Sequence, residues 1–197
     1  MRIDPAIAAQ LAGFAVPLKD TNARLVAPAD MHLTLVPPWR ETMIERAIER
    51  LSKASGPFMP FPLRFDHVGY GPYPCRPRLL WVECPLTENI ASLQSTLMKA
   101  FGQENARPFR PHLTLARIRG SDEGIARAHP INHALSLWQL VRTVELFRSP
   151  PAGATGYQIV ASGSARRKKA ARLTPYRHGT NIWRRENTTR TIVSEAS

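Results

Sequence analysis

One tetrapeptide occurs twice in this sequence: His-Leu-Thr-Leu occupies residues 32–35 and, 80 residues later, residues 112–115. Each copy lies in a short run of alternating apolar and polar residues, which is the pattern of a half-buried β-strand. Because side chains alternate between the two faces of a strand, the histidine and threonine of each copy share one face and the leucines share the other. The leucines can enter a core. The repeat therefore predicts two related halves that each present a histidine and a threonine.

Helices and strands are predicted to alternate in both halves. Periodicity and capping residues predict helices over residues 4–15, 41–52, 87–101 and 122–128. In the second of these helices, Ile44, Ile48 and Leu51 are expected to face the core. Alternating apolar residues predict strands over 24–26, 32–36, 63–68, 78–84, 111–118, 135–148 and 157–162. The strands lack the long apolar runs of a parallel sheet, which favours an α+β fold over a doubly wound one.

The repeated His-Thr pairs suit chemistry at phosphorus. If the two halves pack as a pseudo-twofold pair, His32, Thr34, His112 and Thr114 converge on one cleft. Near neutral pH, two histidines supply one imidazole as a base and one imidazolium as an acid. Threonine hydroxyls can donate hydrogen bonds to phosphate oxygens, and positive charge stabilises the charge that develops in the transition state. In-line displacement at phosphorus by such a pair needs no metal and no other cofactor.

Two other interpretations of these residues have weaker support. A single His-x-Thr strand is usually an ordinary surface face, but two identical copies in the same strand context favour a functional pair. A zinc site is the second alternative, although neither Cys-x-x-Cys nor His-Glu-x-x-His spacing accompanies the histidines. No such context surrounds the remaining histidines, which are His67, His129, His133 and His178.

Arginine gives the chain a strongly basic character. The 27 lysine and arginine residues exceed the 15 acidic residues by 12, and 22 of the 27 are arginine. Residues 1–165 carry a net charge of +5, whereas residues 166–197 carry +7. A basic surface favours polyanionic partners, either nucleic acid or an acidic membrane surface. The like-charge block at 166–169 and the weak periodicity after it predict a folded domain over 1–165 and a disordered tail over 166–197.

The lengths of the apolar runs and the number of cysteines indicate the cellular compartment. No stretch reaches the roughly 18 uninterrupted apolar residues that a membrane helix needs. The most apolar stretch, residues 5–18, is interrupted by Gln10 and Gly13 and lacks the basic start of a secretory signal. Cys75 and Cys84 provide no disulfide framework and indicate a reducing compartment. We therefore expect a cytoplasmic protein. We also expect a monomer whose partner is RNA and not a membrane.

The chain resembles the 2H phosphoesterase superfamily, which is named for two His-x-Thr-x motifs. The resemblance is strongest to the bacterial RNA 2′,3′-cyclic phosphodiesterase branch, also called the 2′-5′ RNA ligase family. It covers about residues 4 to 163 and rests on both motifs and on longer segments at 107–117 (RPFRPHLTLAR), 76–82 (RPRLLWV) and 144–149 (VELFRS). It implies a bilobal, duplicated α+β fold in which helices flank two mainly antiparallel sheets and the active site lies in a central cleft.

The resemblance also implies a role for each site residue. His32 would donate a proton to the leaving 3′-oxygen, and His112 would deprotonate the attacking water. Thr34 and Thr114 would hold the phosphate. Arg117 matches a family arginine that contacts the substrate phosphate. Strict alternation places Arg117 on the strand face opposite His112, so a bulge or the strand end must turn it inward.

The implied activity is the metal-independent opening of RNA 2′,3′-cyclic phosphates to 2′-phosphates. Ligation of such RNA ends could use the same residues, and a non-catalytic RNA-binding module is the third interpretation. The chain departs from the family pattern in two places. Family members open with a strand before the first helix, whereas residues 1–3 lead directly into that helix, so either the true start lies upstream or another segment fills the gap. The basic tail beyond Ser164 is the second departure.

Overall fold

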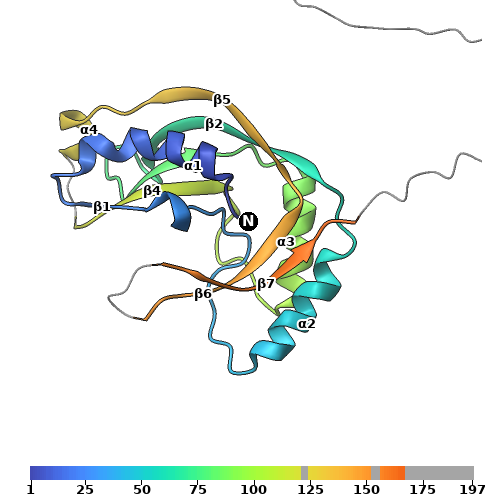
Figure 1. The fold of residues 1–197 in the computed structure, drawn as a ribbon. Helices are drawn as coiled ribbons and strands as arrows, with labels where there is room; N and C mark the ends of the chain where they lie inside the picture. The colour runs from blue at the N-terminus through green and yellow to red at the C-terminus, as the bar shows by residue number, and fades with distance from the viewer. Residues whose placement is uncertain (121–123, 152–155, 167–197) are drawn as a thin grey trace, which may run out of the picture. The chain divides into compact units, whose positions relative to one another are not determined.

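The computed structural model describes residues 1–120, 124–151 and 156–166, and these residues form the α+β fold that the sequence predicts (Figure 1). The helices are α1 (Pro5–Ala12), α2 (Ile44–Ser55), α3 (Glu88–Ala100) and α4 (Ile125–Ala128), with 3₁₀ segments η1 (Gly13–Leu18) and η2 (Pro28–Asp30). The strands are β1 (Ala23–Leu25), β2 (Phe61–Gly71), β3 (Leu79–Glu83), β4 (His112–Ile118), β5 (His133–Val141), β6 (Thr143–Arg148) and β7 (Gln158–Ser164). The predicted tail, 166–197, lies outside the described residues apart from Arg166.

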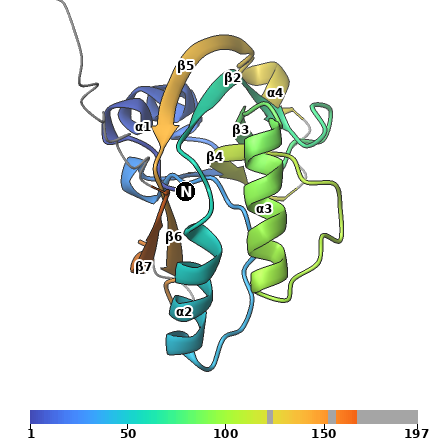
Figure 2. The same cartoon turned by 90° about the vertical axis from the view of Figure 1, so that its right-hand side faces the viewer.

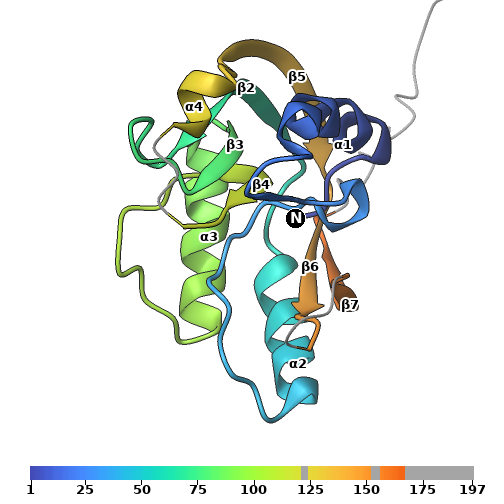
Figure 3. The same cartoon turned by 90° about the vertical axis from the view of Figure 1, so that its left-hand side faces the viewer.

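Two antiparallel sheets of unequal size organise these elements. The larger sheet has the strand order β1-β4-β3-β2-β5, and β6 pairs with β7 in the smaller one. Figures 2 and 3 show α1 and α3 on opposite sides of the larger sheet. Helix α2 contacts both β7 and α3, so it links the smaller sheet to the helix on one face of the larger sheet. Buried side chains from both sheets and from α1, α2 and α3 form one continuous hydrophobic core.

The predicted starts of two helices are confirmed by their capping interactions. The Asp4 carboxylate accepts a hydrogen bond from the Ala6 N–H (2.9 Å), and Pro5 occupies the first turn of α1. The Thr87 side chain accepts from the N–H of Ile90 at the start of α3. Each cap satisfies a backbone donor that the helix itself leaves unpaired. The caps therefore fix where α1 and α3 begin.

The single strand predicted over residues 135–148 is wrong, because the chain changes sheets within it. β5 ends at Val141 in the larger sheet, and β6 begins at Thr143 in the smaller one. Val141 and Val144 are both buried although they lie three residues apart, a spacing that one regular strand cannot place on one face. The inward face therefore passes from odd-numbered to even-numbered residues at Arg142, and the chain turns from one sheet to the other there.

Helix α2 begins three residues later than predicted, and its inward face is only partly the predicted one: Leu51 is buried as expected, Ile44 is half-buried and Ile48 is exposed. Ala47, Leu51 and Ala54 are buried, whereas Ile48, expected to face inward, is 36% exposed. Small side chains allow this helix to approach β7 closely. A Cβ atom added to Gly163 of β7 would lie 2.1 Å from the Ser55 hydroxyl oxygen. The close approach of α2 to β7 thus selects a face of small residues, and Ile48 lies beside that face.

The first His-Leu-Thr-Leu copy is not the regular strand predicted over residues 32–36. Its bridges are isolated: His32 pairs with Arg2 and Leu33 pairs with Leu113, both antiparallel. Leu33 exchanges two backbone hydrogen bonds with Met1, each 2.9 Å long. Two prolines follow at residues 37 and 38, and because proline has no N–H they cannot extend a ladder. Residues 1–3 therefore lie beside the first motif, where the family resemblance predicts a strand that precedes the first helix.

Candidate active site

One isolated β-bridge joins the two motif copies, which run in opposite directions. Leu33 pairs with Leu113 in antiparallel sense, and both leucines are fully buried. In this register, the residues before and after each leucine face the opposite motif, so His32 is placed across from Thr114 and Thr34 across from His112. Both histidines and both threonines line one cavity of about 480 Å³. The structure thus brings together the four residues that the repeat singled out.

Both histidines are oriented by the same backbone hydrogen bond. His32 donates from Nδ1 to the carbonyl oxygen of Asp30 (2.7 Å), and His112 donates from Nδ1 to the carbonyl oxygen of Arg110 (2.8 Å). In each case the acceptor lies two residues before the histidine. A carbonyl can only accept, so this contact assigns the proton of each neutral ring to Nδ1. Nε2 is then the nitrogen available for proton transfer in both rings.

The surroundings of the two imidazoles differ. His32 contacts two aromatic rings: Phe147 of β6, at a centroid distance of 5.1 Å, and Tyr157, which precedes β7, at 4.8 Å. His112 packs against Trp81 of β3 at 4.8 Å. Burial lowers the pKa of His32 below its usual range, and the hydrogen bond to Asp30 opposes this shift. Nearby positive charge, including Arg117, lowers the pKa further.

Arg117 lines the same cavity as the histidines because β4 contains a bulge. Leu80 of β3 pairs with Ala116, whereas the next residue, Trp81, pairs with Thr114, so the extra residue in β4 is Leu115. Leu115 and Ala116 are consecutive and both buried, which shows the break in alternation directly. Beyond the bulge the two faces have exchanged residues. Arg117 therefore returns to the face of His112 and Thr114, as the sequence analysis required for a role at the phosphate.

Four polar residues of the cavity, Arg24, Asp30, Ser149 and Tyr157, were not predicted from the sequence. Arg24 lies across from Arg117 in the β1–β4 pairing, and Ser149 follows the end of β6. Asp30 supplies the carbonyl that orients His32, and its carboxylate accepts from the N–H of Tyr157 (3.0 Å). None of these residues belongs to a repeated motif. The local signal in the sequence is the glycine before Tyr157, since glycine favours turns; in the structure Gly156 adopts a positive φ of 90° just before β7.

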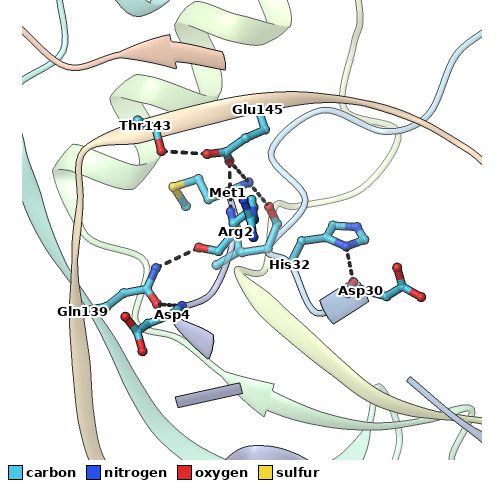
Figure 4. A network of polar contacts seen from close by, with 9 residues as sticks. Met1, Arg2, Asp4, Asp30, His32, Gln139, Thr143 and Glu145 are labelled. Atoms are coloured by element: carbon cyan, nitrogen blue, oxygen red, sulfur yellow. Dashed lines mark hydrogen bonds and ion pairs between the residues drawn. The ribbon is translucent and has the colours of Figure 1, made fainter. Parts of the chain in front are cut away.

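A polar network anchors the backbone beside His32 (Figure 4). The Glu145 carboxylate of β6 accepts from the N–H of Arg2 (3.0 Å) and from the Thr143 hydroxyl (2.6 Å). The side-chain amide of Gln139 in β5 donates to the carbonyl of Arg2 and accepts from the N–H of Asp4, each at 2.9 Å. Residues 1–4 are thus held to the end of β5 and the start of β6. Through the Arg2–His32 bridge, the same contacts fix the position of the first motif.

Within residues 1–120, 124–151 and 156–166, no three His, Cys, Asp or Glu side chains are grouped as a metal ion would require. None of the helices in the described part of the chain is long and apolar enough to cross a membrane.

Solved structures share the fold of this protein over most of the chain. Escherichia coli LigT in complex with NADP⁺ superimposes with a TM-score of 0.67 at 22% identity, covering 85% of this chain and 95% of LigT. A Thermus thermophilus protein superimposes with a TM-score of 0.66 at 22% identity, covering 82% of this chain and 91% of that protein. These likenesses confirm the fold expected from the sequence.

Two curated relatives carry the name RNA 2′,3′-cyclic phosphodiesterase. The protein from Archaeoglobus fulgidus is 28% identical over 54% of this chain, and the protein from Aquifex aeolicus is 28% identical over 49% of it. The matches span 62% and 56% of the length of these relatives. The family model described as the 2′-5′ RNA ligase superfamily matches residues 4–141, which include both His-x-Thr motifs and Arg117. The chain therefore belongs to the 2′-5′ RNA ligase superfamily.

Proposed function

We propose that this protein is a hydrolase that opens the 2′,3′-cyclic phosphate ends of RNA to 2′-phosphates by acid–base catalysis with two histidines. The observation that carries the proposal is the Leu33–Leu113 bridge, which places two His-Thr pairs on one cavity with both Nδ1 atoms already engaged. Two hydroxyls and Arg117 complete a site of the right chemistry for a phosphate. The names of the two curated relatives and the family membership support the same activity.

The proposed reaction is one in-line displacement at phosphorus. Nε2 of His112 accepts a proton from water as the water oxygen bonds to phosphorus. The bond from phosphorus to the 3′-oxygen breaks, and His32 donates a proton to that oxygen. The product carries a 3′-hydroxyl and a 2′-phosphate. Thr34, Thr114 and Arg117 stabilise the negative charge that builds up on the phosphoryl oxygens, and no step in this scheme uses a metal ion.

The acid role of His32 has to be reconciled with its lowered pKa. Burial and nearby positive charge favour the neutral ring, whereas a general acid must carry a proton. A bound cyclic phosphate is an anion and sits beside His32 in this scheme, so it opposes the charge of Arg117 and raises the pKa of the ring. His32 is thus expected to take up its proton together with the substrate. LigT, which shares the fold of this chain, has been solved in complex with 3′-AMP and with phosphate, and these ligands support a phosphate-containing substrate.

The experiment that tests the proposal is hydrolysis of a 2′,3′-cyclic mononucleotide in the presence of EDTA, followed by chromatography. We expect conversion to the 2′-nucleotide. No turnover of cyclic mononucleotides or cyclic-ended RNA would instead favour a non-catalytic RNA-binding module. A 3′-nucleotide product would mean that the leaving oxygen, and with it the two histidine roles, had been misassigned.

Ligation is the second candidate, favoured by the description of the family model. A 5′-hydroxyl would take the place of water as the nucleophile, and His112 would accept its proton. The same assay run with a 5′-hydroxyl oligonucleotide separates the two activities, because only ligation produces a longer strand. Cytoplasmic location and a monomeric state stay predictions.

A further inference from the structure

A second cavity, of about 660 Å³, lies where β2 and β4 end and β3 begins. The loop between β2 and β3 and the loop between α3 and β4 both contribute to it, and Figures 2 and 3 show these loops on the same side of the molecule. We call it the arginine cavity; its lining residues are Pro72, Tyr73, Arg76, Pro77, Arg78, Arg107 and Gly120. Among these described residues, three are cationic and none is acidic. The cavity of about 480 Å³ that contains His32 and His112, which we call the active cavity, shares no lining residue with the arginine cavity.

The arginine cavity and the active cavity are lined by two consecutive residues, Arg78 in the turn before β3 and Leu79 at the start of β3. Leu79 lines the active cavity, and Arg78 lines the arginine cavity. Leu79 pairs with Arg117 in the β3–β4 ladder, and the N–H of Ile118 donates to the Arg78 carbonyl (3.0 Å). Neighbouring strands lie about 4.8 Å apart and consecutive Cα atoms about 3.8 Å apart. The backbones that carry Arg78 and Arg117 are therefore close neighbours.

The chemistry of the arginine cavity is that of a surface for a nucleic-acid strand. Arg78 and Arg107 are exposed, so their guanidinium groups can reach phosphates in solvent. Arginine binds phosphate oxygens through two parallel hydrogen bonds, which favours phosphates over other acidic groups. Tyr73 is 68% exposed beside these arginines, and exposed aromatic rings of this kind stack on nucleobases. Cationic groups interleaved with an aromatic ring are typical of single-strand binding.

We propose that the arginine cavity binds the RNA strand that leads to the cyclic end, contacting phosphates upstream of the one held at His32 and His112. This inference rests on the proposed function, because the active cavity is what positions the 3′ end of that strand. The substrate class is then an RNA strand of several nucleotides, for which a cyclic mononucleotide is a minimal substitute. An acidic protein segment is the competing occupant. RNA is favoured because the backbone that carries Arg78 is paired with the backbone beside Arg117, which lies in the proposed phosphate site.

The test compares two double variants with equal loss of charge. Arg78→Gln with Arg107→Gln removes two cations of the arginine cavity, and Arg127→Gln with Arg142→Gln removes two exposed cations elsewhere. Binding is measured by fluorescence anisotropy of a labelled oligoribonucleotide with a 3′-phosphate, over a range of salt concentrations. Loss of two single-strand phosphate contacts should make the log–log salt slope shallower by about 1.4. We expect this change and at least tenfold weaker binding in the first variant, with near-native values in the control.

A second variant probes stacking without changing charge. Tyr73→Ala should weaken oligonucleotide binding by roughly fivefold to a hundredfold, since base stacking on one aromatic ring has about that effect. It should leave the salt slope unchanged. Turnover of a cyclic mononucleotide should be the same in all these variants and in the native protein, which also shows that each variant is folded.

The possible results separate this inference from the proposed function. Native affinity for the oligonucleotide in the Arg78 and Arg107 variant would overturn the inference, whatever the protein does to cyclic phosphates. Equal binding and full competition by an aspartate-rich peptide of the same charge would also overturn it, in favour of a protein partner. Weakened RNA binding in a protein that opens no cyclic phosphate would keep the arginine cavity as an RNA site and reject the hydrolase instead.

Discussion

The two copies of His-Leu-Thr-Leu have the same sequence but are held in different ways. The second copy lies within β4 and pairs with β3 through His112, Leu113 and Thr114, and β1 pairs with the residues that follow, 116–118. The first copy makes only isolated bridges, to Arg2 and to Leu113, and depends on side-chain contacts at the smaller sheet. Both nevertheless use the same contact from Nδ1 to a carbonyl two residues earlier. A local device thus orients each imidazole, and the larger scaffold sets the environment of each ring.

This difference is consistent with the two roles that we propose for the repeated motif. His32 is enclosed by Phe147, Tyr157 and the chain near Asp30, and its pKa is lowered by burial. His112 contacts Trp81 on the sheet and shares its strand with Arg117. Two histidines in unlike surroundings can hold unlike protonation states, which acid–base catalysis requires. Substitutions in and beside each motif copy therefore test how far the two copies are alike.

The largest expected effect comes from removing either imidazole. His32→Ala and His112→Ala should each lower kcat by roughly 10²–10⁴-fold, which is the usual contribution of a positioned acid or base. Neither side chain belongs to the core, so circular dichroism should show a native fold. His133→Ala, at an exposed histidine outside the cavity, is the control and should retain native turnover. Near-native activity in either folded variant would contradict the two-histidine mechanism.

Arg117 tests the consequence of the bulge in β4. Arg117→Gln should lower kcat by about 10²-fold, because it removes a positioned cation from the developing charge. The matched control is Arg119→Gln, two residues further along, which is exposed and lies outside the described lining of the active cavity. Steady-state kinetics on a cyclic mononucleotide measure both. Equal, small effects of the two substitutions would mean that the bulge does not bring Arg117 to the substrate.

The threonines test the symmetry of the two copies directly. Thr34→Val and Thr114→Val should each lower kcat/KM by about tenfold or more, since a hydrogen bond to a charged group contributes about 1.5–3 kcal/mol. Because the Leu33–Leu113 bridge places the two hydroxyls equivalently, the two losses should be similar. Thr21→Val, whose hydroxyl donates to the carbonyl of Leu18, is a control outside the site. A large loss at one threonine only would show that the copies hold the phosphate unequally.

The sequence predicted the elements of the site better than their pairing. Alternation within residues 112–115 is enough to assign the faces of His112 and Thr114, and the same argument required a bulge before Arg117. Pairing between Leu33 and Leu113 could not be predicted, because strand partners depend on tertiary packing and not on local periodicity. Tyr157 and Arg24 were missed since neither belongs to a repeat. The change of sheet at Arg142 did leave a signal, the three-residue spacing of Val141 and Val144.

The smallest expected effect is a shift in the titration of His32. Its pKa in the folded protein is lowered, so the unfolded chain binds more protons between the two values. The contribution of His32 to stability is therefore present above the unfolded pKa of about 6.5 and is lost as the pH falls through the folded pKa. NMR titration of the ring should give a midpoint below 6.5, and inorganic phosphate should raise it. A midpoint that phosphate does not move would contradict substrate-linked protonation.

The acid and base roles proposed for His32 and His112 can be tested most directly by changing the leaving atom. In a 2′,3′-cyclic nucleotide with sulfur in place of the 3′-oxygen, the leaving group is a thiolate, which departs without a proton because thiols are far more acidic than alcohols. If His32 is the acid, this substrate should restore much of the lost turnover to His32→Ala and little to His112→Ala, which still lacks its base. Restoration in His112→Ala and not in His32→Ala would contradict the assignment and exchange the roles of the two copies.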